Sequence, residues 1–254
     1  SITAVETDKG TIQCNKIIVG VGPWLRDIWN MLELPKTISI KDDNGKMHHD
    51  FPMWKYWFLT EGVLRLNPST QRTNDGKMPP VLHVDTDAPL YSDIDQSLIT
   101  DKLWGIYYKP DFHFHGIQGG SSPYLVDQPA DNVNVDPYGP DSEEFVVGDK
   151  FAHMWTSALA FCQKRFEGKS KFYKKGPTGG LGCFTPDNFP IFDVFRENVY
   201  IIADSNHGYK MIGVGKLVAN EIYGAKSNLL EPFRFSRFVE GNLHPISNSP
   251  FPWS

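Results

Sequence analysis

The sequence predicts a mixed α/β fold of the α+β kind, in which two end segments of one α/β layer enclose a domain built on an antiparallel sheet. Two observations predict it. Strand–turn–helix patterns stand near both ends of the chain, and the long middle consists of short aromatic runs separated by Pro, Gly, Asn and Asp. With 254 residues, 40% of them hydrophobic, the chain is long enough for one or two domains with a substantial core.

The N-terminal segment predicts a hairpin that leads into a buried strand. Residues 8–10, Asp-Lys-Gly, supply the turn, and residues 16–22 are nearly all apolar, as in a strand buried on both faces. Pro23 stands where a helix can begin, and apolar residues follow at helical spacing up to Leu32. Because the chain opens inside a strand, we expect a segment before Ser1.

The middle and the last third supply the remaining elements. Strands are expected at residues 55–59, 104–108 and 112–116, and an amphipathic helix at 151–162. The last third predicts a buried strand at 198–204, a turn at 205–208 and a helix at 211–223 that Gly224 ends. The expected domains are therefore residues 1–34 with 178–226, residues 35–177, and a C-terminal tail at 227–254.

Composition excludes several functional classes. The net charge is -5, and no block of Lys or Arg indicates binding to nucleic acid or to an anionic membrane. Cys14, Cys162 and Cys183 are far apart and predict neither a disulfide framework nor a zinc site, which fits the cytoplasm or another reducing compartment. His113 and His115 have no third ligand nearby, so we expect no metal. The longest apolar stretch is too short to span a membrane, so a soluble protein is expected.

The sequence contains three extended motifs: IIVGVGPWL at 17–25, GGLGCFTPDNFPIFD at 179–193, and VYIIADSNHGYKMIGVGKLVANEIYG at 199–224. Together they resemble the D-amino-acid-oxidase-like family of FAD-dependent oxidoreductases, especially its glycine oxidase, sarcosine oxidase and dimethylglycine dehydrogenase branch. The second motif is similar to that family's YTPDGLPVIG segment and the third to its ATGHSGHGFKLAPALG segment. The family's N-terminal GxGxxG fingerprint is not found in these residues. The resemblance is therefore to a C-terminal portion without the N-terminal Rossmann segment.

The resemblance implies an FAD-binding α/β layer around a substrate domain, with FAD bound non-covalently. A helix that begins near Tyr209 would stabilise negative charge on the reduced flavin. Ordinary turn chemistry is an equally good explanation for Thr185 and Asp187. Cys183 is a candidate for a covalent flavin link, but a buried, unreactive thiol is the favoured alternative. The candidate cofactor-binding residues are Gly22, Trp24, Thr185, Asp187, Ser205, Asn206, Gly208, Tyr209 and Met211.

Three residues are candidates for roles near the substrate. Lys210 matches a lysine that contacts the substrate carboxylate in the sarcosine oxidase branch, although a solvated surface lysine is the commoner case. His207 could contact the flavin edge or the substrate, or its imidazole could form its hydrogen bonds within its own loop. Gln118 stands where sarcosine oxidases have a lysine linked to oxygen activation, which favours an electron acceptor other than oxygen.

The resemblance implies an enzyme that oxidises a C–N bond of a small amine or amino acid by hydride transfer to flavin. Two alternatives stay open. One is a family member that oxidises a hydroxy acid or glycerol phosphate; the other is a non-catalytic subunit or fragment that acts through a protein interface. Without the Rossmann segment, the isolated chain is not expected to bind FAD tightly or to be active.

Overall fold

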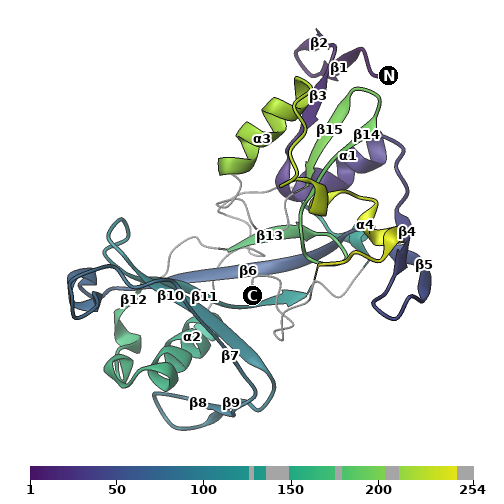
Figure 1. Ribbon diagram of the computed structural model, residues 1–254. Coiled ribbons are helices and arrows are strands. Elements are labelled where there is room, and N and C mark those ends of the chain that lie inside the picture. Colours follow the sequence, from purple (N-terminus) through teal and green to yellow (C-terminus); the bar gives the residue numbers. More distant parts are fainter. Residues whose placement is uncertain (126–128, 136–148, 175–178, 204–211, 245–254) are drawn as a thin grey trace. The chain divides into compact units, whose positions relative to one another are not determined.

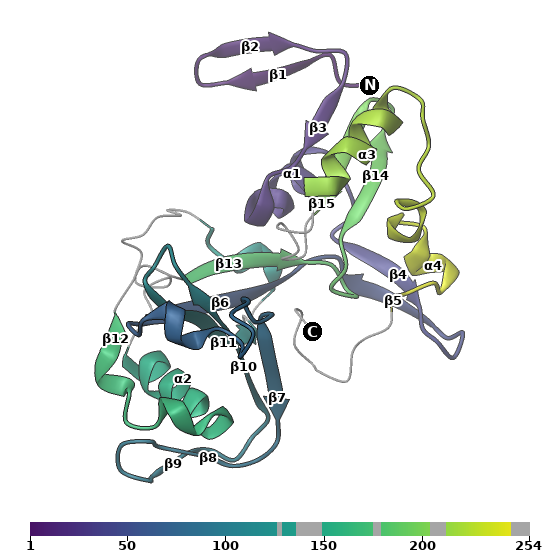
Figure 2. The same ribbon diagram turned by 60° about the vertical axis from the view of Figure 1, so that its left-hand side comes forward.

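The computed structural model describes residues 1–125, 129–135, 149–174, 179–203 and 212–244 (Figures 1 and 2). Its contacts divide the chain into two compact units. The first unit holds residues 1–57, 126–135 and 182–253, and the second holds residues 58–125 and 136–181. Residues 35–57 thus group with the two ends of the chain. One reason is that strand β4 (Thr37–Lys41) packs against helix α4 (Arg237–Glu240) near the C-terminus.

A three-stranded sheet is the centre of the first unit. Its order is β14 (Ile191–Arg196), β15 (Val199–Ala203), β3 (Ile17–Val19). β15 pairs with β3 in parallel, with Val199 opposite Ile17, and with β14 in antiparallel. The prediction that strands near both ends of the chain share one layer is therefore confirmed.

Helices accompany this sheet (Figure 2). The 3₁₀ turn η1 (Gly22–Trp24) and helix α1 (Leu25–Met31) follow β3 directly. Helix α3 (Ile212–Ile222) buries Val218 against Phe192, Tyr200 and Leu230. Gly224 has a φ of 96°, the left-handed conformation that ends a helix at C′, as the sequence predicts.

Two hairpins and short helical turns complete the first unit. The hairpins are β1 (Ala4–Thr7) with β2 (Gly10–Gln13), and β4 with β5 (Met47–Pro52). The short turns are η3 (Ala130–Asn132) and η8 (Glu231–Phe233). The hairpin expected at the N-terminus is confirmed.

The second unit is built on an antiparallel sheet. The order of its strands is β12 (Tyr173–Lys174), β6 (Lys55–Leu64), β11 (Gly116–Leu125), β10 (Trp104–Asp111) and β7 (Leu82–Thr86). A further strand, β13 (Gly179–Phe184), also pairs with β6. Helix α2 (Asp149–Cys162) covers one face of the sheet and buries Trp155, Ala158 and Leu159 in its core. The smaller elements are η2 (Pro68–Gln71), β8 (Leu90–Tyr91), β9 (Leu98–Thr100), η5 (Lys164–Phe166) and η6 (Ser170–Phe172).

The strand expected at residues 112–116 is wrong. Residues 112–115 form the turn between β10 and β11, and Gly116 is the first residue of β11. The Asp111 carboxylate accepts hydrogen bonds from the backbone N–H groups of His113 and Phe114 at 2.8 and 3.0 Å. His115 has a φ of 51°. A capping aspartate and a left-handed residue reverse the chain, whereas the alternation Phe-His-Phe-His alone suggests a strand.

In the part of the chain that the structure describes, no helix is long and apolar enough to cross a membrane, and no group of three or more His, Cys, Asp or Glu side chains could hold a metal ion.

Candidate functional site

The turn after β3 presents two of the predicted cofactor-binding residues, Gly22 and Trp24. Gly22 has a φ of 55°, and a Cβ added there would meet nothing within 4 Å. The glycine is therefore required by the backbone conformation and leaves open space beside the turn. The Tyr56 hydroxyl donates a 2.7 Å hydrogen bond to the Pro23 carbonyl and holds the turn in place.

Behind this turn lies Cys183, which is 2% exposed. Burial raises the pKa of its thiol to about 12, although a hydrogen bond with Tyr56 acts in the opposite direction. A thiolate is the reactive form of cysteine, so Cys183 stays protonated and unreactive at neutral pH. Nearby, Arg26 donates to the carbonyls of Ala130 and Val133, both at 2.6 Å.

The predicted Thr185–Asp187 segment is fixed by its own side chains. Thr185 donates a 2.7 Å hydrogen bond to the Phe189 carbonyl. Two nitrogens of Arg237 each donate to the Asp187 carboxylate at 2.8 Å, and the Asp187 and Arg237 side chains are both nearly completely buried. The backbone N–H of His244 adds a 3.3 Å contact. The Asp187 side chain thus holds Arg237 and His244 against the loop that follows β13.

The surroundings of Asp187 favour its charged form. Burial is the largest single influence and acts to raise the pKa of the carboxyl, but the hydrogen bonds and charge of Arg237, together with the backbone N–H groups of Phe189 and His244, outweigh burial, and the pKa lies below its ordinary value. A buried carboxylate with a bidentate arginine partner is a structural ion pair of the strong kind.

The structure shows a partly buried lysine beside this segment, which the sequence does not single out as a site residue. The Lys55 ammonium donates a 3.1 Å hydrogen bond to the Pro186 carbonyl. Burial lowers the pKa of Lys55 to about 8, and the nearby Asp187 carboxylate raises it by a smaller amount. The available signal was a single charged residue inside the otherwise apolar and aromatic run MWKYWF at 53–58.

In the second unit, polar side chains gather on the sheet face opposite α2. Trp104, Ile106 and Tyr108 point into the α2 core, so the alternate residue Tyr107 lies on the other face. The Tyr107 hydroxyl donates to one oxygen of Glu61. The Gln118 amide donates to the other oxygen at 3.3 Å.

An imidazole extends this polar cluster. His83 lies directly opposite Tyr107 across the β7–β10 ladder, and their rings stack with centroids 5.8 Å apart. Glu61, Tyr107, Gln118 and His83 come from four neighbouring strands. The structure therefore gives Gln118, a predicted catalytic residue, a hydrogen-bond partner that the sequence did not identify, and Glu61 links it to Tyr107. We call these four residues the polar face.

The sequence has aromatic runs at residues 54–58 and 104–108, and four of their aromatic residues are buried in cores. Trp54 and Tyr56 are buried in the first unit, and Trp104 and Tyr108 in the second. Six other predicted site residues (Ser205, Asn206, His207, Gly208, Tyr209 and Lys210), together with Met211, lie outside the described residues.

Comparison with known proteins identifies a shared fold. No family model matches the chain, and no curated protein matches it. Solved structures do match: L-proline dehydrogenase from P. horikoshii (TM-score 0.56, 20% identity, 95% of this chain and 52% of that one), glycine oxidase from Geobacillus kaustophilus (0.53, 11%, 92% and 48%) and fructosyl peptide oxidase from E. terrenum (0.51, 15%, 91% and 47%).

The chain thus spans about half the length of the structures that it matches. At these sequence identities the likeness establishes the fold but not the reaction. The resemblance of the sequence to D-amino-acid-oxidase-like oxidoreductases is confirmed at the level of the fold.

Proposed function

We propose that this chain is the C-terminal, substrate-side part of an FAD-dependent oxidoreductase that oxidises a C–N bond of a small amine or amino acid. The observation that carries the proposal is the parallel pairing of β3 with β15. It places two of the three family-like motifs in one sheet. The solved structures with this fold are named for proline, glycine and fructosyl peptides, all of them amino compounds.

Several features of the first unit fit a bound flavin. The Gly22 turn has open space beside it, and within the described residues β3 pairs on one edge only, with β15. A nucleotide-binding segment from outside these 254 residues would complete the sheet at the other edge. We assign the cofactor contacts to the Gly22–Trp24 turn, the Thr185–Asp187 segment and residues 205–211. FAD, when bound, accepts a hydride from the carbon beside the amine.

The protonated and buried state of Cys183 favours non-covalent binding. In the Thr185–Asp187 segment the carboxylate of Asp187 is engaged by Arg237, so we assign its cofactor contact to backbone groups rather than to the carboxylate.

The substrate is oriented by charge and hydrogen bonding. Lys210 binds the substrate carboxylate, because an ammonium on a flexible stem suits an anion. Orientation and exclusion of water are the main demands of hydride transfer on a protein. Gln118, in place of a lysine, favours an electron acceptor other than oxygen.

The test is a flavin spectrum followed by anaerobic reduction. The chain is purified alone and joined to a nucleotide-binding segment, and both are mixed with FAD and then with a series of amines, hydroxy acids and glycerol phosphate. We expect a bound-flavin spectrum in the longer protein and its bleaching by amines. Bleaching by hydroxy acids or glycerol phosphate instead would assign another substrate class. A longer protein that binds no flavin would support the non-catalytic alternative.

A further inference from the structure

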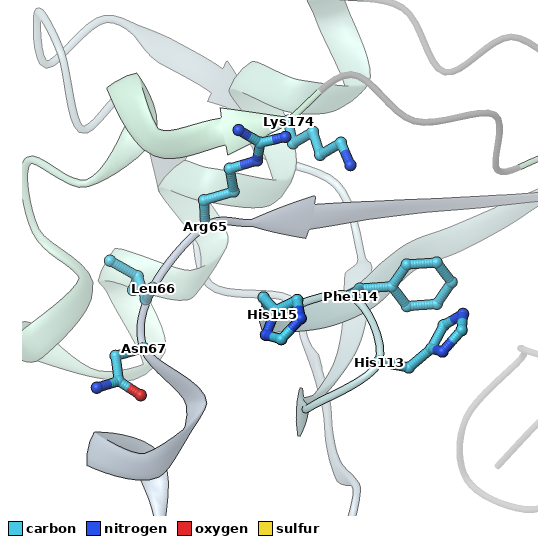
Figure 3. Close-up of a pocket in the computed structure, with 7 residues that line it drawn as sticks. All are labelled: Arg65, Leu66, Asn67, His113, Phe114, His115 and Lys174. Carbon is cyan, nitrogen blue, oxygen red and sulfur yellow. The ribbon is translucent and has the colours of Figure 1, made fainter.

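A cavity at one end of the second unit is lined by basic side chains and is separate from the polar face. Its volume is about 390 Å³, within the range of small-molecule sites. The lining residues are Arg65, Leu66, Asn67, His113, Phe114, His115 and Lys174 (Figure 3). Four of the seven can carry positive charge, and none is acidic. We call this cavity the basic pocket.

The strand register brings the two strongest cations together. Leu64 pairs with Tyr173 and Val63 with Lys174 in the β6–β12 ladder, and the Arg65 N–H continues it by donating to Phe172 at 2.8 Å. Arg65 and Lys174 are therefore diagonal neighbours on one face of this ladder, within reach of each other's long side chains. Leu64 and Tyr173 point to the opposite face, into the α2 core.

Two cations side by side repel each other unless an anion lies between them. Among the described residues, no carboxylate forms an ion pair with Arg65 or Lys174. By contrast, Lys109, at the end of the neighbouring strand, has Asp111 at 3.3 Å. The basic pocket thus concentrates positive charge that the described part of the unit does not neutralise.

The opposite wall is the turn that the Asp111 carboxylate caps. It carries His113, Phe114 and His115, and His115 adopts a left-handed φ of 51° that a bulky residue rarely takes. This wall is held close to β6, since a Cβ added at Gly116 would meet the Leu64 carbonyl at 2.3 Å. The geometry is therefore set by backbone contact rather than by the side chains that line the pocket.

We propose that the basic pocket binds an organic phosphate, with its phosphoryl group between Arg65 and Lys174 and its organic part against Phe114 and Leu66. A guanidinium offers a planar fork to phosphate oxygens and an ammonium adds a point charge, so the pair suits a dianion better than a single carboxylate. The imidazoles of His113 and His115 supply further donors. This site is distinct from the flavin and amine chemistry proposed above and does not depend on it.

The experiment measures binding of phenyl phosphate, inorganic phosphate and benzoate to the 254-residue chain by calorimetry at fixed ionic strength. The variants are Arg65→Gln and Lys174→Gln, which lie on different strands, and the matched control is Lys102→Gln, an exposed lysine outside the lining. We expect saturable binding of phenyl phosphate, stronger than that of inorganic phosphate or benzoate. Each pocket variant should weaken it by about ten- to a hundredfold, as for loss of a charged hydrogen bond, and the control should leave it unchanged.

Equal loss in Lys102→Gln would mean non-specific attraction and would overturn the proposal. So would benzoate binding as tightly as phenyl phosphate, or an absence of saturable binding. The NMR resonances of the His113 and His115 imidazoles show where the ligand binds. They should shift when phenyl phosphate is added to the wild type and to Lys102→Gln. Thermal unfolding of Arg65→Gln and Lys174→Gln verifies that both variants are folded before the affinities are compared.

Discussion

Asp187 in the first unit and Glu61 in the second are both carboxylates with hydrogen-bond donors on each oxygen, but the donors differ. Asp187 is buried and receives two nitrogens of Arg237 at 2.8 Å. Glu61 is partly exposed and accepts from a tyrosine hydroxyl and an amide, both uncharged. Removing Asp187 would leave a buried guanidinium without its anion, whereas the two donors named for Glu61 carry no charge.

The largest expected effect is that of Asp187→Ala. The change leaves the Arg237 guanidinium buried without its anion, and breaking such a pair costs about 3–5 kcal/mol of the free energy of unfolding. The measurement is urea unfolding at pH 7, with Asp43→Ala as the matched control because Asp43 is exposed. A loss in Asp187→Ala no larger than in the control would break the comparison.

The same pair predicts a pH dependence. Because the folded-state pKa of Asp187 lies below its ordinary value of 3.8, the ion pair contributes full stability above that value and loses it as the pH falls further. Asp187→Asn should therefore flatten this part of the acid-unfolding profile.

Lys55→Met tests a partly buried charge in the same region. The pKa of Lys55 falls from 10.5 to about 8 on folding, so between these values the unfolded chain binds more protons and stability rises with pH. At about 1.4 kcal/mol per pKa unit, the rise amounts to about 3 kcal/mol. Unfolding curves from pH 7 to 10.5 should show this rise in the wild type and in the exposed control Lys9→Met, and its loss in Lys55→Met. A rise that persists in Lys55→Met assigns it to other groups.

These charges mark the limit of prediction from sequence. The strands β3 and β15 follow from apolar runs and the end of helix α3 from Gly224, and the sequence predicts both elements and a common layer for the two strands; their direct parallel pairing comes from the structure. The Asp187–Arg237 pair joins residues 50 positions apart, and no local pattern indicates it. The local pattern predicts Lys55 only as part of an aromatic strand, because its hydrogen-bond partner, the Pro186 carbonyl, is 131 residues away.

Lys210→Met tests the proposed binding of the substrate carboxylate by Lys210. If Lys210 anchors the substrate carboxylate, loss of its charge costs about 1.5–3 kcal/mol of binding, or ten- to a hundredfold in kcat/KM. The measurement is the reductive half-reaction of the FAD-bound protein with amines that bear or lack a carboxylate; Lys216→Met, exposed on α3, is the control. Equal slowing of both amine classes would show that Lys210 acts on the flavin or on folding instead.

Gly22→Ala tests the turn assigned to the cofactor. At a φ of 55° an alanine costs about 1–2 kcal/mol, although the added Cβ meets no neighbouring atom. Gly20→Ala is the matched control, because an added Cβ there also meets nothing and its φ is not in the left-handed range. Urea unfolding should separate the two. Equal stabilities would mean that the turn relaxes without cost.

Glu61→Gln has the smallest expected effect on stability and decides whether the comparison holds. Glutamine keeps the shape and one acceptor oxygen for Tyr107 and Gln118, so we expect a loss below about 1 kcal/mol of the free energy of unfolding. Urea unfolding measures this loss, and Glu167→Gln, at an exposed glutamate of the same unit, is the control. If Glu61→Gln unfolds the second unit as readily as Asp187→Ala unfolds the first, Glu61 is a structural carboxylate like Asp187.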